Sequence, residues 1–320
     1  MKMSKKSSVH KTSIGGQAVM EGVMMRGVKK SVVAVRHTDG TIVVEQMKFS
    51  NLKDKYPILK FPIIRGAVGF VESMILGYKS LARSADLAGI ELEDDEPSKF
   101  EKWLSKITGG NILNVVMGVA LFLGLGFAVL LFTILPAVST KGLDNILGGA
   151  LGDYKTLIEG IIRLTIFLIY LSSVSMIKDI KRVFEYHGAE HKTIHCYEAN
   201  EELTVENARK YSTKHPRCGT SFLLIVMIIS ILVYSLPIVP WNNIFLRIII
   251  KLCFLPLIAG LSYEIIKFAG KYDNWFTKII SFPGILLQKL TTKEPDNAQL
   301  EVAIASINAV LTDNKEEDKW

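Results

Sequence analysis

Long apolar segments dominate the chain from residue 112 onward. Three of them, residues 112–136, 157–177 and 222–239, are mostly apolar and close to the ~20 residues that a helix needs to cross the hydrocarbon core of a bilayer. A fourth, residues 244–266, has a similar length. The pattern predicts an all-α polytopic membrane protein with about four transmembrane helices. A small cytoplasmic α/β portion with an N-terminal β-hairpin accompanies them.

The fourth apolar segment differs from the others in its charges. Arg247 and Lys251 lie near its start and Glu264 near its end. We count it as a span whose charged side chains face the protein interior or lie near the headgroups. These residues could also line a transport path, but four spans without a detectable internal repeat argue against a transporter.

Ahead of the spans the pattern becomes that of β-strands. Residues 31–49 contain two β-branched runs around Asp39-Gly40, which is typical of a β-hairpin. An isolated hairpin is marginal in water, so we expect it to pair with another element. In residues 15–27, the glycines indicate turns and the methionines an adaptable apolar surface.

Three further segments have the pattern of amphipathic helices. Residues 61–87 predict a helix that lies in the interface or re-enters the membrane, with a fifth full span as the alternative. Trp275, Phe276 and residues 279–290 predict an interfacial helix anchored by aromatic side chains. Behind Pro295-Asp296, we expect a helix that docks on the cytoplasmic portion, from apolar residues at helical spacing: Leu300, Ile304, Ile307 and Leu311.

These elements divide the chain into six segments. They are a cytoplasmic N-terminal segment with the hairpin (1–60), an interfacial or re-entrant helix with an acidic linker (61–110), transmembrane helices one and two (111–177), a cytoplasmic His/Cys loop (178–220), transmembrane helices three and four (221–266), and an interfacial helix followed by a cytoplasmic C-terminal helix (267–320).

Composition and charge support a multi-pass protein of the cell membrane. The mean hydropathy of +0.29 is high for a soluble protein. Lys and Arg are concentrated in residues 178–220 and sparse in the loops at 137–156 and 237–243. By the positive-inside rule, the His/Cys loop and both termini are cytoplasmic. The net charge of +7 suits a face lying on an anionic lipid bilayer and requires no nucleic acid. No apolar core of signal-peptide length follows the basic N-terminus.

A cluster of histidines marks the candidate site. If the second span continues as a helix, His187, His191 and His195 lie four residues apart and share a face. His187, Glu190 and His191 form the order His-x-x-Glu-His of the inverted zincins, in which two imidazoles bind zinc and the carboxylate polarises water. Gly188 lowers helix propensity inside this motif. Glu190 is thus the candidate general base.

A third ligand could come from two places. His215 and Cys218 lie just before the third span, and zinc accepts both imidazole and thiolate. Glu264 is a rival third ligand, although it could instead pair with Lys267 or Arg247. A reducing compartment favours metal or catalysis over disulfides for the cysteines.

Other interpretations of these residues stay open. The cluster could be a structural zinc knot with four ligands, or a polar network without metal. His195 could be a surface histidine, and Cys253 a small buried hydrophobe. Thr204 is expected to cap a short helix, and a solvated helical face is expected for Glu198, Glu201, Glu202 and Glu206.

Longer motifs extend beyond these histidines. They read GGQAVMEGVMMRG (15–27), HGAEHKTIHCYE (187–198), HPRCGTSF (215–222) and QKLTTKEPDNAQLEVAIAS (288–306). Over nearly the whole chain, they resemble the YqhQ family of bacterial membrane proteins, which are often labelled as predicted metal-dependent enzymes. The resemblance implies these signature positions: His187, Glu190, His191, His215 and Cys218, with Gly16, Glu21 and Arg26 near the N-terminus.

The N-terminal signature has two interpretations of its own. Glu21 and Arg26, together with Gly16 and Gln17, could reach the metal site and supply a carboxylate and a cation for the transition state. Glu21 and Arg26 could equally form a surface ion pair that contributes little.

The leading function is a membrane-embedded, zinc-dependent hydrolase at the cytoplasmic face, acting on a membrane peptide or a lipid-like substrate. His187, His191 and His215 or Cys218 would hold Zn²⁺, and Glu190 would accept a proton. The alternative is a non-catalytic membrane protein. Its metal or polar knot would be structural, and its Met-rich surface would dock a membrane-protein partner in membrane biogenesis or regulation.

Overall fold

The computed structural model describes residues 10–48, 52, 56–89, 112–236, 239–272 and 274–319. The predicted acidic linker at residues 91–96 lies outside them. Two compact units make up the chain. The first contains residues 1–90, 171–229 and 255–320, and the second contains residues 91–170 and 230–254.

Four short strands of the first unit form an antiparallel sheet in chain order. They are β1 (Gly15–Val19), β2 (Gly22–Arg26), β3 (Ser31–Arg36) and β4 (Ile42–Met47). The pairing of β3 with β4 confirms the predicted hairpin. In its turn, Gly40 adopts a φ of 88°, which glycine tolerates without strain. β2 supplies the further pairing that an isolated hairpin lacks.

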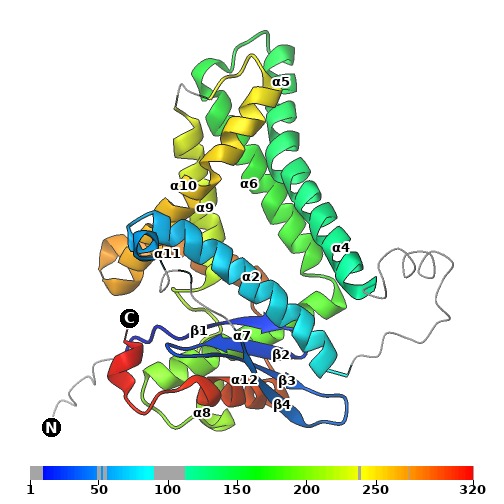
Figure 1. The fold of residues 1–320 in the computed structure, drawn as a ribbon. Helices are drawn as coiled ribbons and strands as arrows, with labels where there is room; N and C mark the ends of the chain where they lie inside the picture. The colour runs from blue at the N-terminus through cyan, green and yellow to red at the C-terminus, as the bar shows by residue number, and fades with distance from the viewer. Residues whose placement is uncertain are drawn as a thin grey trace. The chain divides into compact units, whose positions relative to one another are not determined.

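Helices accompany this sheet in the first unit (Figure 1). They are α2 (Ile64–Leu87), α7 (Lys178–Glu198), α8 (Val205–Arg209), α11 (Trp275–Thr291) and α12 (Asn297–Val310), with single turns η1 (Pro57–Lys60) and η4 (Lys315–Asp318). The side chains of Thr204 and Asp296 cap α8 and α12, each by accepting a backbone N–H of the first turn. The predicted C-terminal helix and the predicted cap at Thr204 are therefore confirmed.

Alternating side chains bury both faces of the sheet. Val23 and Met25 point to one face, where they pack with residues of α7 and α12. Met24, between them in β2, points to the other face and packs with Leu76 of α2. Figure 1 accordingly shows α2 and α12 on opposite sides of the sheet. Because successive side chains of a strand alternate between faces, β2 and β3 have continuous apolar runs, residues 23–25 and 32–35, rather than an apolar side chain at every second residue.

The remaining helices are strongly apolar. They are α4 (Ile112–Val129), the π-helical turn η2 (Leu130–Ile134), α5 (Leu135–Ile146), the turn η3 (Gly152–Tyr154), α6 (Lys155–Val174), α9 (Gly219–Tyr234) and α10 (Ile244–Lys271). The π turn directly precedes Pro136, which cannot donate the regular helical hydrogen bond.

Three helical stretches in the described residues are long and apolar enough to cross a membrane. They are Gly118–Ile146, Gly152–Val174 and Ile244–Lys271. The predicted third span forms α9, an apolar helix of only 16 residues. The structure is thus compatible with a multi-pass membrane protein, with support by length and composition for three of the four predicted spans.

Three charged residues of α10 pair with charged side chains elsewhere in this chain. In the second unit, Arg247 and Lys251 are buried, and both bind the carboxylate of Glu159 in α6. Glu264 lies in the first unit and accepts a hydrogen bond from Arg65 Nε at 2.7 Å. Glu264 was expected to pair with Lys267 or Arg247, but its hydrogen-bond partner is Arg65. Arg65 lies in the first turn of α2, beside α10. Cys253 is exposed rather than buried, because it lies on an outer face of this apolar helix.

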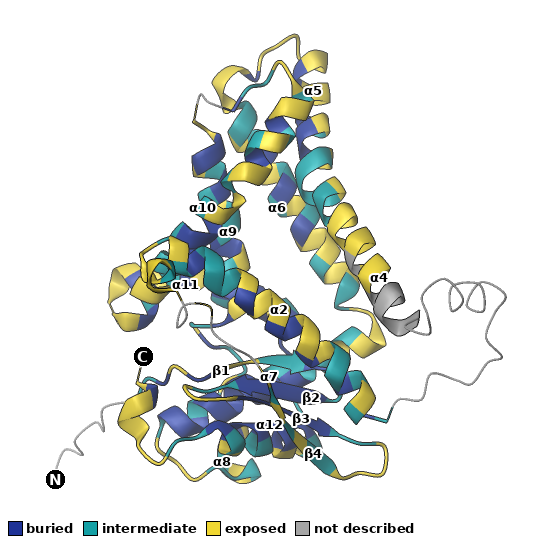
Figure 2. Cartoon of the chain, in the orientation of Figure 1, coloured by how far each residue is buried: buried dark blue, intermediate teal, exposed yellow. Residues whose placement is uncertain are grey.

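α11 has the surface expected of an interfacial helix. Trp275 and Phe282 are 74% and 64% exposed, whereas Thr277 and Gln288 face the protein. Figure 2 shows a largely exposed outer surface on this helix. An apolar exposed face opposite a polar buried one is unusual in water and typical of a helix that lies against lipid.

Candidate functional site

α7 carries the histidine motif, and it begins anew after the second apolar helix. α6 ends at Val174, and Ile177 adopts an extended conformation before α7 starts at Lys178. The expectation of one continuous helix was therefore wrong. Beyond this break, α7 packs along β1 and α12.

Gly188 has a packing role in this helix. Its missing side chain leaves room for the chain after α11, since a Cβ at this position would lie 2.0 Å from the Lys293 carbonyl oxygen. The Lys293 N–H also donates to the carbonyl oxygen of Phe184, at 2.9 Å. Gly188 lowers the helix propensity of the motif, and it is also the residue that allows the backbone at Lys293 to pack against α7.

His187, His191 and Cys218 converge. Their ligand atoms all lie within 4.8 Å of one another, and His187 Nε2 is 3.2 Å from Cys218 Sγ. His187 Nδ1 faces the Thr291 carbonyl oxygen at 2.8 Å, and His191 Nδ1 faces the Thr213 carbonyl oxygen at 2.6 Å. Because a carbonyl only accepts, each Nδ1 donates its proton, and Nε2 is the ring nitrogen that would bind a metal ion once it has lost any proton of its own.

This donor set fits a zinc ion. Histidines that bind metal usually donate their second ring N–H to a carbonyl or carboxylate, as both do here. Bond lengths of ~2.0–2.3 Å around a tetrahedral ion place its ligand atoms ~3.3–3.8 Å apart, close to the 3.2 Å between His187 and Cys218. Three protein ligands would leave a fourth position for water or substrate, as in catalytic zinc sites.

His187 and Cys218 also affect each other's pKa through their charges. Burial alone would raise the pKa of the Cys218 thiol, but His187 and His191 hold this pKa well below its usual value. Burial alone would lower the pKa of His187, yet the Cys218 thiolate raises it to about 9. The site thus favours the thiolate form, which is the form that binds metal.

Glu190 lies beside these ligands with one unsatisfied oxygen. Its Oε1 accepts the Gly16 N–H at 3.1 Å, while its buried Oε2 has no hydrogen-bond partner among the described residues. Burial raises the pKa of this carboxyl, against the opposing effect of His187 and His191. Gly16 permits this contact, since a Cβ there would lie 3.0 Å from Glu190 Cδ.

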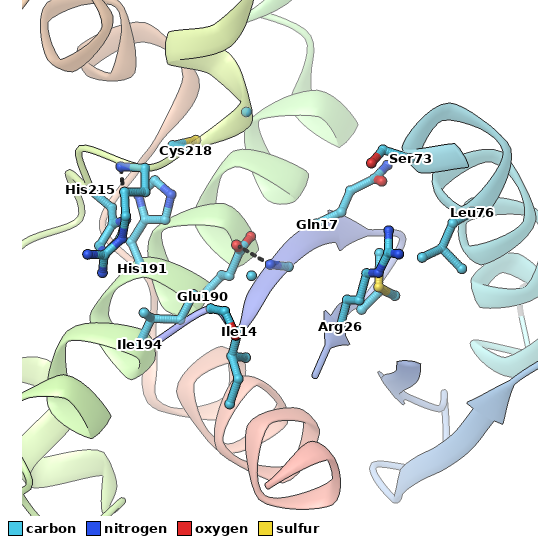
Figure 3. Close-up of a pocket in the computed structure, with 16 residues that line it drawn as sticks. Ile14, Gln17, Arg26, Ser73, Leu76, Glu190, His191, Ile194, His215 and Cys218 are labelled. Atoms are coloured by element: carbon cyan, nitrogen blue, oxygen red, sulfur yellow. Dashed lines mark hydrogen bonds between the residues drawn. The ribbon is translucent and has the colours of Figure 1, made fainter. Parts of the chain in front are cut away.

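A cavity of about 250 Å³ opens beside Glu190. Figure 3 shows side chains from several elements around it, with Glu190 and His191 on α7, Gln17 on β1 and Ser73 on α2. Arg26 of β2 also lines the cavity. The N-terminal signature therefore reaches this cavity through Gly16, Gln17 and Arg26. Glu21 does not line it and binds Arg182 instead, with 2.6 Å from Arg182 Nη2 to Glu21 Oε2.

His215 belongs to a second cluster with His195 and Glu198. Its Nδ1 accepts the Arg217 N–H at 3.3 Å, and its Nε2 faces Glu198 Oε2 at 3.5 Å. Burial lowers the pKa of His215 to about 4, so it is neutral at pH 7. His195 Nε2 donates to the Lys214 carbonyl oxygen at 2.9 Å. Since both nitrogens of His215 have partners within the protein, this cluster is built as a hydrogen-bonded network.

Glu198 is buried, which corrects the expectation of a solvated face. Its side chain is only 6% exposed and pairs with Arg217, whose side chain is 7% exposed. Its Oε1 also accepts the Thr12 N–H at 2.8 Å. Helical spacing carried the missed signal, because Glu198 follows His191 and His195 by seven and three residues and so shares their face.

Two methionines of the Met-rich segment are buried. Met24 is 5% exposed and Met25 is fully buried, on opposite faces of β2. The expectation of an adaptable outer surface here was wrong, because α2 and α12 cover the two faces of the sheet.

Comparison with known proteins agrees with the sequence motifs. No solved structure matches the chain. A protein of Bacillus subtilis (strain 168), described as "Uncharacterized protein YqhQ", is 38% identical over 307 residues, which cover 95% of this chain and 94% of that protein. Residues 61–313 match the model of a family described as "Protein of unknown function (DUF1385)". The chain therefore belongs to this DUF1385 family.

Proposed function

We propose that this protein is a membrane-embedded, zinc-dependent hydrolase that acts at the cytoplasmic membrane face on a membrane peptide or a lipid-like substrate. One observation carries the proposal. Glu190, whose buried Oε2 has no hydrogen-bond partner among the residues that the structure describes, lines a cavity beside the cluster of His187, His191 and Cys218. An unsatisfied buried carboxylate oxygen is costly, so its retention favours a role in binding or proton transfer.

The residues divide the chemical work between them. His187, His191 and Cys218 would hold a zinc ion, which supplies Lewis acidity and lowers the pKa of water toward ~7. Glu190 Oε2 would accept a proton from water and return it to the leaving group. The Gly16 N–H keeps Oε1 in place while Oε2 exchanges the proton.

Cavity size and lining limit the reacting group. About 250 Å³ accommodates a carbonyl or phosphoryl group with its nearest substituents but is below the ~300–1,000 Å³ of pockets that enclose a whole small molecule. Arg26 and Arg217 line the cavity and suit a group that gains negative charge during reaction. Only the bond to be hydrolysed and its nearest substituents would therefore enter the cavity, and the rest of the substrate would stay outside.

Metal content tests the metal site before any substrate is known. We expect about one zinc per chain in the detergent-solubilised protein, and its loss in both His187→Ala and Cys218→Ala. Glu190→Gln should keep the zinc. If the wild type holds no zinc after zinc is offered, the hydrolase proposal fails.

Activity then separates the enzyme from a structural zinc site. The substrates would be p-nitrophenyl acetate, bis(p-nitrophenyl) phosphate and a fluorogenic membrane peptide. Hydrolysis by the wild type that Glu190→Gln abolishes, with zinc retained, would support the proposal. Hydrolysis that survives Glu190→Gln would remove Glu190 as the base.

Cys218 itself favours a second candidate function, that of a nucleophile. Its Sγ accepts the Thr220 N–H at 3.4 Å, so the sulfur caps the first turn of α9. His187 Nε2 lies 3.2 Å away and is oriented by the Thr291 carbonyl. A thiolate at a helix N-terminus beside an imidazole is the arrangement of cysteine hydrolases and acyltransferases.

Alkylation distinguishes the two candidates. In a Cys196→Ala/Cys253→Ala background, Cys218 is the single remaining thiol of the chain. A nucleophile predicts rapid reaction with iodoacetamide in protein purified without chelator. A zinc ligand predicts slow reaction that chelation accelerates.

A further inference from the structure

A second cavity, of about 410 Å³, lies between the end of α10 and the start of α11. Its lining includes three cationic side chains, Lys11, Lys278 and Arg217, and none of its described lining residues is acidic. Ser281, which bears a hydroxyl group, lines it as well. Cations with hydroxyl donors are the chemistry that recognises a phosphate group.

Each cation is positioned by the fold. Lys11 Nζ donates to the Gly270 carbonyl oxygen at 3.1 Å, at the end of α10. Arg217 is held in place by an ion pair with Glu198, which offsets part of its positive charge. Lys278 lies in the first turn of α11, which Asn274 caps through its bond to the Thr277 N–H. The N-terminus of this 17-residue helix adds a favourable field for an anion.

The position of the cavity favours a lipid as the source of the phosphate. α10 is one of the helices long and apolar enough to cross a membrane, and it ends at Lys271. The cavity includes Gly270 and Tyr272. It therefore opens at the depth where headgroups lie.

Apolar surface surrounds the cavity. Phe282 and Ile285 form part of its lining, and Phe282 is 64% exposed. A separate groove of about 600 Å³ is lined almost entirely by apolar side chains of α9, α10 and α11, so these three helices present a surface suited to lipid chains. Inorganic phosphate has no apolar part that could contact this apolar surface, whereas a phospholipid has.

We propose that this cavity binds the headgroup phosphate of an anionic phospholipid, with Lys11 and Lys278 as the main phosphate ligands and Arg217 as a fixed cation behind them. The acyl chains extend along the exposed apolar face of α11. The site requires neither the zinc ion nor Glu190. It shares Arg217 with the cavity of the proposed hydrolase, so variants of Lys11 and Lys278, which do not line that cavity, test it separately.

Native mass spectrometry of the full chain in detergent measures this binding directly. The probes are dioleoyl phosphatidylglycerol, dioleoyl phosphatidylcholine and inorganic phosphate. We expect the wild type to prefer phosphatidylglycerol, and Lys11→Gln/Lys278→Gln to bind it roughly 10- to 30-fold more weakly. Lys11→Arg/Lys278→Arg should keep the preference, because the charges remain.

A matched control tests for general attraction between charges. Lys289→Gln/Lys210→Gln removes the same charge from exposed positions outside the cavity and should leave the preference unchanged. The proposal is overturned by an equal loss in this control, by unchanged binding in Lys11→Gln/Lys278→Gln, or by displacement of the lipid by equimolar inorganic phosphate. Size-exclusion profiles of all variants establish that they are folded.

Discussion

His187 and Cys218 lie 31 positions apart in the chain, and Nε2 of the one is 3.2 Å from Sγ of the other. This contact joins α7 to the start of α9 and selects Cys218, rather than His215, as the third candidate ligand. His215 has its own partners in Glu198 and the Arg217 N–H.

The two clusters should therefore respond differently to mutation. His215→Ala is expected to keep the zinc that Cys218→Ala loses, and to lower the melting temperature, since it leaves Glu198 without one partner. Zinc per chain and thermal unfolding, measured on the same preparations, check this. Loss of zinc in His215→Ala would place His215 among the ligands.

Glu198→Gln should destabilise the first unit strongly. It leaves the buried Arg217 guanidinium without its carboxylate, a change that costs about 3–5 kcal/mol for buried pairs. The free energy of unfolding of detergent-solubilised protein measures the effect. Glu198→Gln/Arg217→Met should recover part of the loss, whereas Glu206→Gln, at an exposed position, should change little.

Acid should weaken the same network. Burial lowers the pKa of His215 from 6.5 to about 4. The folded protein therefore binds fewer protons there than the unfolded chain. The stability from neutral His215 is complete above pH 6.5 and is lost as the pH falls toward 4. The pKa of Glu198 is also lowered, against the effect of its burial, by His215 and Arg217, so the stability that it contributes is complete above pH 4.5 and is lost as the pH falls below that value. Melting temperatures between pH 7 and 4 should fall less steeply in His215→Gln.

Gly188→Ala should destabilise the protein by about 1–3 kcal/mol, because its methyl group would overlap the Lys293 carbonyl. Gly142→Ala is the matched control, since a Cβ there meets no atom within 4 Å and alanine favours the helix. Thermal unfolding of both variants checks the prediction. Equal melting temperatures would show that the segment after α11 can move away.

Glu159→Gln should reduce the yield and melting temperature of the second unit. Arg247 and Lys251, each 1% exposed, would keep their charges in an apolar environment without the carboxylate they share. Glu159→Leu/Lys251→Met should recover stability relative to Glu159→Gln. Fluorescence-detected size exclusion in detergent compares the three proteins.

Local patterns predicted the elements whose signals lie close together in the chain. The hairpin around Asp39-Gly40, the cap at Thr204 and the helix behind Asp296 follow from residues within a few positions of one another. The histidine spacing likewise placed His187 and His191 on one face, because helical periodicity alone determines it.

Contacts between distant segments were beyond such patterns. Nothing near Glu198 indicates that Arg217 and the Thr12 N–H will meet it, and nothing near Glu264 indicates Arg65. Two-residue alternation could not show that β2 is covered on both sides, so its methionines looked like a surface. These positions depend on tertiary packing, which acts through side chains that are far apart in sequence.

The docking of α12 on the sheet sets an order of events during synthesis. Ser306 Oγ donates to the Val23 carbonyl oxygen at 3.0 Å, across 283 positions. The side of the sheet that α12 covers is therefore incomplete while the apolar helices that lie between the strands and α12 in the chain are being made. Residues 297–310, which form α12, must be made before that side is fully closed. Until then, apolar side chains of these strands stay exposed, which makes this part of the nascent protein prone to aggregation.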